Sequence, residues 1–283
     1  MRQAVVYGVL FLTWFWYGCQ KSHTKQAPTY IHVDSFSFVA NPLVKGITLS
    51  HQISCVWAYY NNNPIGVFDL PATFPVMATG KGTLELFPGV TINGQNDFTS
   101  IYPFYEPDTF TFAEQPGKTI DRLPVTRYYS AIKPYIISDF DTSGYTKFSL
   151  DGSGVAMFVT NTSVFEGQGS GVISLNNPSD SSFDSTIHSF VIPTGAAFIE
   201  FNYKCSIPFS VFLQANLGSI ASLAPHALAG IYPSDHWQKF YLNVADYAAQ
   251  YQGTSYNLYF KASLPAGGTG GSVLLDNIQL ISY

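Results

Sequence analysis

Most of this chain consists of short runs in which apolar residues alternate with polar ones, a pattern typical of strands that are buried on one face. Turn-forming combinations of Gly, Pro, Asn and Asp separate these runs roughly every 8 to 12 residues. No segment keeps the period of about 3.6 residues that marks an amphipathic helix. The pattern predicts an all-β protein, and the clearest strands of its first half are residues 30–38, 53–60, 65–68, 82–87 and 109–112.

The length of the chain favours two β-sandwich domains. About 260 residues follow Cys19, more than most single sandwiches need. We place the first sandwich at residues 30–130 and the second, a jelly roll, at residues 135–283. Within the first, Asn61-Asn62-Asn63-Pro64 predicts a hairpin turn, because asparagine tolerates left-handed backbone angles and proline fixes its own φ.

The first residues have the pattern of an export signal. One positive charge at Arg2 precedes an uncharged run over residues 4–17, which is shorter than the roughly 20 apolar residues of a membrane-spanning helix. Gly18 then precedes Cys19, and a small residue before a cysteine is typical of lipoprotein processing. We expect residues 1–18 to be a lipoprotein signal peptide, Cys19 to be lipidated, and residues 19–29 to form a tether.

The residues around Cys19 leave alternatives open. A lipobox usually has leucine and a small residue where this chain has Trp16 and Tyr17, although relaxed forms are common in Bacteroidetes. A plain secretory signal and an uncleaved anchor are the other interpretations. Lipidation predicts a location at the outer membrane. Because Lys21 and Lys25 follow the cysteine where surface display favours acidic residues, the periplasmic and the cell-surface face both stay open.

Composition supports an exported protein and excludes one class of partner. Charged residues make up 11% of the chain, against about 25% in an ordinary soluble domain, whereas aromatic residues reach 16%. A net charge of −5 offers no basic surface for nucleic acid. Cys55 and Cys205 stand in apolar stretches of different expected domains. We expect both to be buried free thiols, since a disulfide between them would have to cross the domain boundary.

Several motifs of the first domain support a resemblance to a known family. They are the runs at residues 56–60, 66–76, 88–90, 93–94 and 102–105. Together they resemble a family of uncharacterised Bacteroidetes outer-membrane lipoproteins. Their middle part looks like a small β-sandwich of the PEGA or carboxypeptidase-regulatory type. The resemblance implies a module that presents or braces a neighbouring domain.

The second domain resembles a galactose-binding-like jelly roll, the fold of many carbohydrate-binding modules. The order of five weak motifs carries this resemblance, at residues 165–171, 197–203, 236–242, 256–262 and 274–278.

That fold often holds a structural calcium ion. The resemblance implies Asp276 together with Asp141 or Glu166 as ligands, since calcium prefers hard oxygen donors. The alternative is that Asp276 caps a turn by accepting hydrogen bonds from local backbone amides.

The sequence favours binding over catalysis. No histidines stand at a metal-ligand spacing, and neither a Gly-x-Ser-x-Gly elbow nor a Walker loop occurs. Glutamate is scarce, with only five residues, although carboxylates that meet in the fold cannot be recognised from sequence. We expect no enzyme activity and no required cofactor.

Aromatic side chains are the best candidates for a glycan site, because flat sugar faces pack on aromatic rings. We expect Trp57 and Trp237 to be buried in the cores, which leaves the tyrosines. Loops at one end of a jelly roll commonly bind the ligand, here residues 176–183, 217–235 and 247–251. The candidate ligand-binding residues are Tyr232, Asp235, His236 and Tyr251.

A second function class is equally consistent with two sandwiches. The chain would then be an accessory subunit of an outer-membrane transport, secretion or barrel-assembly complex. Residues 102–105, Tyr-Pro-Phe-Tyr, suit this interpretation as an anchor for a protein partner, or else fold over the sandwich edge. An exposed aromatic strip with polar neighbours would favour a glycan, and a larger apolar patch would favour a protein.

Overall fold

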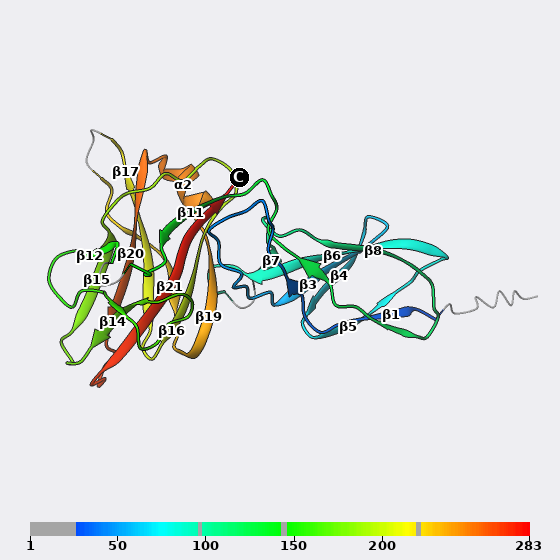
Figure 1. The fold of residues 1–283 in the computed structure, drawn as a ribbon, viewed down its shortest axis with the longest axis horizontal. Helices are drawn as coiled ribbons and strands as arrows, with labels where there is room; N and C mark the ends of the chain where they lie inside the picture. The colour runs from blue at the N-terminus through cyan, green and yellow to red at the C-terminus, as the bar shows by residue number, and fades with distance from the viewer. Residues whose placement is uncertain (1–26, 96–97, 143–145, 219–221) are drawn as a thin grey trace, which may run out of the picture.

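Two β-sandwiches make up the described part of the protein, and they lie next to one another along its long axis (Figure 1). This computed structural model describes residues 27–95, 98–142, 146–218 and 222–283. The all-β prediction, with two sandwiches of which the second is a jelly roll, is confirmed. The expected signal peptide and Cys19 lie outside the described residues. No helix within the described ranges is long and apolar enough to cross a membrane.

The first sandwich encloses its own apolar core. Its strands are β1 (Thr29–Val33), β2 (Ser37–Phe38), β3 (Cys55–Tyr60), β4 (Asn63–Asp69), β5 (Ala72–Val76), β6 (Lys81–Thr91), β7 (Thr99–Ile101), β8 (Asp108–Ala113), β9 (Thr119–Asp121) and β10 (Val125–Thr126). Strand β6 pairs with β3 on one edge and with β7 and β8 on the other, while β1 pairs with β5 and β9 in a second sheet. Ile31 and Phe74 of the second sheet share a fully buried cluster with Val56 and Leu84 of the first.

The predicted asparagine turn is confirmed. Asn61 and Asn62 have φ angles of 48° and 64° between the antiparallel strands β3 and β4. The Asn61 side chain also accepts a hydrogen bond of 2.8 Å from the backbone amide of Thr83, which ties the hairpin to β6. The expected strand over residues 30–38 is instead two short strands, β1 and β2, which pair in different sheets.

The second sandwich is a jelly roll of two facing antiparallel sheets. Its elements are β11 (Lys133–Ser138), β12 (Phe148–Leu150), β13 (Phe158–Thr160), β14 (Ser170–Leu175), β15 (Ser181–Thr186), β16 (Ala197–Cys205), β17 (Phe209–Asn216), β18 (His226–Ile231), β19 (Ser234–Asn243), α2 (Ala245–Tyr251), β20 (Ser255–Ser263) and β21 (Gly271–Ser282). One sheet has the order β13-β14-β21-β16-β19, with β11 also paired to β21. The other sheet has the order β12-β15-β20-β17-β18. We call them the inner sheet and the outer sheet.

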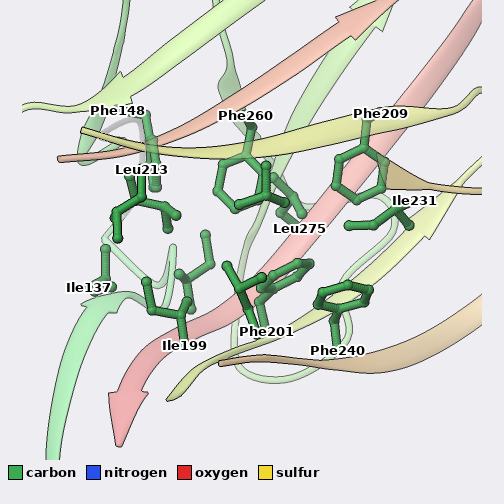
Figure 2. Packing of buried hydrophobic residues seen from close by; sticks show 14 of the residues in the cluster. Ile137, Phe148, Ile199, Phe201, Phe209, Leu213, Ile231, Phe240, Phe260 and Leu275 are labelled. Atoms are coloured by element: carbon green, nitrogen blue, oxygen red, sulfur yellow. The ribbon is translucent and has the colours of Figure 1, made fainter. Parts of the chain in front are cut away.

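Aromatic rings fill the space between the inner and outer sheets (Figure 2). Phe201 of the inner sheet stacks on Phe240 at 5.1 Å and meets Phe260 of the outer sheet edge-on at 5.5 Å. Burying a phenylalanine side chain completely stabilises a fold by about 1.5 to 3 kcal/mol. This core therefore holds the two sheets together without help from a disulfide in the described residues, and both described cysteines are free and buried as predicted.

A third cluster joins the two sandwiches. Tyr102, Phe104 and Tyr105 are fully buried against Phe198 and Tyr241 on the outward side of the inner sheet. Residues 102–105 were expected to anchor an external partner or to cover a sandwich edge. Both expectations need correction, because these rings are buried between the two sandwiches of the same chain.

Two smaller expectations were also wrong. Trp57 and Trp237 are half-buried and belong to none of the three buried clusters, since both point away from the sandwich interiors. Residues 247–251, expected as a binding loop, form most of helix α2. The run Ala-Asp-Tyr-Ala-Ala-Gln-Tyr is too short to show a helical period in the sequence, which is why the pattern missed it.

Candidate functional site

Three aromatic side chains lie on the outward face of the outer sheet. Phe183 stands on β15, Phe212 on β17 and Tyr259 on β20, and β20 is hydrogen-bonded to both of the other strands. Strand alternation puts them there, because Val211 and Leu213 on either side of Phe212 belong to the core and Phe212 does not. We call Phe183, Phe212 and Tyr259 the aromatic platform.

The rings of the platform touch one another. Phe183 stacks on Tyr259 with ring centroids 4.8 Å apart, and it meets Phe212 nearly edge-on at 5.5 Å. Aromatic pairs at such distances attract one another by about 0.5 to 1.5 kcal/mol beyond their burial. Phe183 and Phe212 are half-buried, whereas Tyr259 is buried beneath its neighbours. The result is one continuous apolar surface that remains open to solvent on Phe183 and Phe212.

Uncharged polar groups surround the platform. The Tyr259 hydroxyl donates a hydrogen bond of 2.7 Å to Gln214, and the Asn216 amide donates one of 2.8 Å to Asn257. Burial raises the pKa of Tyr259, and the nearby Asp151 carboxylate raises it further, so this hydroxyl stays protonated. Each amide keeps hydrogen-bonding capacity for a ligand hydroxyl.

One cation lies over the platform. The Lys261 ammonium is 5.9 Å from the ring centroid of Phe183 and 6.0 Å from that of Phe212. Beside it, a hollow of about 310 Å³ is lined in part by Ser210, Phe212, Lys261 and Ser263. The outer sheet therefore combines apolar rings, hydroxyls, amides and one positive charge on an open face.

The corresponding face of the inner sheet is closed where the first sandwich packs on it. Phe198 and Ile281 point outward from that sheet and are buried against the first sandwich. The backbone amide of Asn93 also donates a hydrogen bond of 2.9 Å to the backbone carbonyl of Tyr241 across the junction. A ligand that needs a broad sheet face therefore has the outer sheet available and much of the inner sheet blocked.

Three of the predicted ligand-binding residues do come together. Tyr232 is 83% exposed and lies in the turn between β18 and β19. Asp235 and His236 follow at the start of β19. His236 Nδ1 is 2.7 Å from the Asp235 carboxylate. A hollow of about 660 Å³, lined in part by Lys204, Asp235 and His236, lies on one side of this turn. A smaller one of about 270 Å³, lined in part by Tyr232, lies between the two sandwiches.

The fourth predicted residue lies elsewhere. Tyr251 belongs to α2 and packs on Tyr247 at 4.5 Å and on His226 at 6.0 Å. His226 begins β18, whereas Tyr232 directly follows its end, and a strand of this length spans about 17 Å. Tyr251 therefore does not share a site with Tyr232.

The predicted calcium ligands are occupied by protein hydrogen-bond donors. Asp276 accepts hydrogen bonds from the Ser170 hydroxyl at 2.7 Å and from the backbone amides of residues 165, 166 and 277 at 3.2, 3.3 and 2.8 Å. Asp141 accepts a hydrogen bond of 2.6 Å from the backbone amide of Gln168, and Glu166 accepts one of 2.9 Å from the side-chain amide of Asn277. Within the described ranges no group of three or more His, Cys, Asp or Glu side chains is placed to share a metal ion.

Burial raises the pKa of Asp276 to about 6, in spite of the hydrogen bonds that it accepts. The arrangement matches the turn-capping alternative, in which the carboxylate holds the loop before β14 in place. The structural calcium ion that the jelly-roll resemblance implies at Asp276 stays a prediction.

The comparisons with known proteins find likeness in structure only. The chain is similar to the CBM22-1 xylan-binding domain of Paenibacillus barcinonensis Xyn10C, with 18% identity, a TM-score of 0.38, and coverage of 52% of this chain and 93% of that one. It is also similar to the family 11 carbohydrate-binding module of Lic26A-Cel5E from Clostridium thermocellum, with 16% identity, a TM-score of 0.38, and coverage of 54% and 96%. No protein-family model matches the chain, and no curated protein matches it. Function has to be inferred from the side chains of this chain.

Sequence reasoning missed the aromatic platform. The signal was present, since Phe183, Phe212 and Tyr259 each occupy the outward position of an alternating strand. Outward phenylalanines on an otherwise polar strand face are the feature to look for. The order β15-β20-β17, which makes them neighbours, does not follow from any one strand.

Proposed function

We propose that the protein binds glycans without catalysing a reaction, and that the aromatic platform is the binding site. The single observation that carries the proposal is the pair Phe183 and Phe212, two half-buried rings in contact on a face that is otherwise polar. The flat C–H faces of sugar rings pack on such surfaces, and sugar hydroxyls need polar partners such as the side-chain amides of Gln214 and Asn257.

Binding without catalysis is the simplest use of this face. Hydrolysis of a glycosidic bond ordinarily requires two carboxyl groups that flank it. The outward positions of β15, β17 and β20 around the platform have Ser, Asn and Gln side chains, and their one charged residue is Lys261. Such a surface holds a sugar chain and supplies no acid and base pair.

The test is affinity electrophoresis of the soluble chain, from residue 20 onward, against a panel of neutral and acidic polysaccharides. We expect Phe212→Ala and Phe183→Ala each to weaken binding about tenfold, since losing one stacked ring costs roughly 1 to 3 kcal/mol. Tyr232→Ala removes a more exposed ring outside the platform and serves as the matched control.

The outcomes separate the two candidate sites. Loss of binding in Tyr232→Ala with none in Phe212→Ala would move the site to the turn formed by Tyr232, Asp235 and His236. Failure of the unmodified chain to bind any polysaccharide of the panel would refute glycan binding.

We further propose that lipidation of Cys19 holds this binding protein at the outer membrane. Support comes from the apolar run over residues 4–17 and from Gly18 directly before the cysteine. The rival function, an accessory subunit of an outer-membrane complex, loses the anchor once expected at residues 102–105, which are buried within the chain. Affinity purification from mild-detergent membrane extracts distinguishes the two, because a stoichiometric barrel partner would favour the rival.

A further inference from the structure

We infer that the aromatic platform selects acidic glycans, with Lys261 as the residue that binds their carboxylate groups. This inference rests on the proposed glycan-binding function and names its substrate class. It starts from the position of one ammonium group over two rings that a sugar would otherwise cover.

Lys261 has no carboxylate partner within the described part of the chain. The ion pairs among the described residues join Arg122 to Asp108, Arg127 to Glu106, His236 to Asp235 and Lys239 to Glu200. Lys261 takes part in none of them, and its side chain instead crosses the rings of the platform. An exposed ammonium without a counterion can accept an anion from a ligand.

The register of the sheet places this ammonium inside the platform. Lys261 pairs with Phe183 on β15 and with Ser210 on β17, and Phe212 is the next outward residue along β17. A sugar ring stacked on Phe183 or Phe212 therefore lies next to Lys261. A neutral sugar displaces the ammonium from the rings and offers it only hydroxyl groups. A uronic acid offers a carboxylate, whose charge-assisted hydrogen bonds are about twice as strong as neutral ones.

The surrounding charges orient such a ligand. Asp151 follows β12 at the edge of the sheet, where its backbone amide donates to the Phe183 carbonyl at 2.8 Å. Its carboxylate repels an acidic group on that side. On the other side the hollow holds the hydroxyls of Ser210 and Ser263 beside Lys261, and both can donate to a carboxylate.

The net charge of the chain makes selective binding of a polyanion informative. At −5 the protein repels polyanions in general, so unspecific attraction does not explain affinity for one. Such affinity requires a cation at the binding site. Because only one ion pair would form, the affinity should weaken with rising salt concentration as expected for a single charged contact.

The experiment compares acidic polymers with their carboxyl-reduced counterparts, which differ in the carboxylate alone. The probes are polygalacturonate, alginate and hyaluronate, each in both forms, and binding is measured by isothermal titration calorimetry. We expect the unmodified chain to bind at least one acidic polymer about tenfold more tightly than its reduced form, the size of one good charged contact. Lys261→Met should abolish this preference, so that the acidic polymer and its reduced form bind with equal affinity, whereas Lys261→Arg should keep the preference.

Other results overturn the inference in recognisable ways. Equal affinity for acidic and reduced forms, or a preference that survives in Lys261→Met, rejects acidic selection while glycan binding stands. Absence of binding to every acidic and neutral polymer rejects both. Because Lys261 is exposed, thermal unfolding of Lys261→Met should match that of the unmodified chain, which excludes misfolding as the cause.

Discussion

The Lys239 ammonium lies 2.6 Å from the carboxylate of Glu200, and the two side chains are 1% and 0% exposed. Tyr128 and Gln279 donate further hydrogen bonds of 2.7 and 3.0 Å to the same carboxylate, and Tyr102 donates to its second oxygen. Burial raises the pKa of both tyrosines, and the Glu200 charge raises it further, so both hydroxyls remain donors. The Glu200 carboxylate of the second sandwich therefore accepts hydrogen bonds from Tyr102 and Tyr128, which precede that sandwich in the chain.

Glu200→Gln should destabilise the protein strongly. The substitution leaves the Lys239 charge buried without a counterion, and breaking a buried pair in this way costs about 3 to 5 kcal/mol. Urea unfolding followed by fluorescence measures the change. Glu200→Gln combined with Lys239→Met should recover part of the loss, because both charges are then removed. A cost below about 1 kcal/mol for Glu200→Gln would show that the pair is not buried as described.

Asp276 should make stability depend on pH between about 4 and 7. Its folded pKa of about 6 exceeds the unfolded value of about 3.9, so the folded state binds the proton more tightly. Its contribution is complete below pH 4 and is lost as the pH rises through 6. Relative to Asp276→Asn, the unmodified protein should lose about 2 kcal/mol across this range, a value reduced for solvent screening. Equal pH profiles would contradict the raised pKa.

Calcium should leave the melting temperature unchanged. Asp276 already accepts hydrogen bonds from one hydroxyl and three backbone amides, and Asp141 is bonded to the Gln168 amide. A cation would have to displace these donors. Differential scanning calorimetry with millimolar calcium against a chelator measures the effect. A saturable rise in the melting temperature that disappears in Asp276→Asn would establish the structural ion implied by the jelly-roll resemblance.

Cys19→Ser should release the protein from the membrane fraction. Serine cannot carry the thioether-linked diacylglycerol, so a lipid anchor is lost while the described sandwiches are unaffected. Membrane fractionation and mass spectrometry of the N-terminal peptide provide the readout. Retention of Cys19→Ser in the membrane would favour the uncleaved anchor, and secretion of the unmodified protein would favour the plain signal peptide.

The sequence predicted features that depend on neighbouring residues. The turn at Asn61 and Asn62 follows from the backbone angles that asparagine tolerates, and the alternating burial of β6 over residues 82–87 follows from strand geometry. The buried thiols of Cys55 and Cys205 follow from their apolar surroundings. Each of these can be read within a window of about ten residues.

Features that depend on distant residues could not be predicted in this way. Glu200 interrupts the apolar strand β16, and a lone carboxylate there has no visible partner until Tyr102 and Tyr128 are brought to it. The rings of residues 102–105 looked like an external anchor because the sequence does not reveal that Phe198 and Tyr241 cover them. For the same reason the platform emerges only when β15, β20 and β17 are seen side by side.

The junction between the sandwiches has a mechanical consequence. The described chain begins with β1 in the first sandwich, whereas the platform lies on the outer sheet of the second, beyond the packed rings and the Glu200 network (Figure 1). If the platform binds a polymer as proposed, tension on that polymer must pass through this junction to reach the N-terminal end. Tyr102, Phe104 and Tyr105 would have to slide past Phe198 and Tyr241 together before the halves could separate. Under a pulling force the two sandwiches should therefore behave as one rigid body. They should not move as two domains joined by a flexible linker.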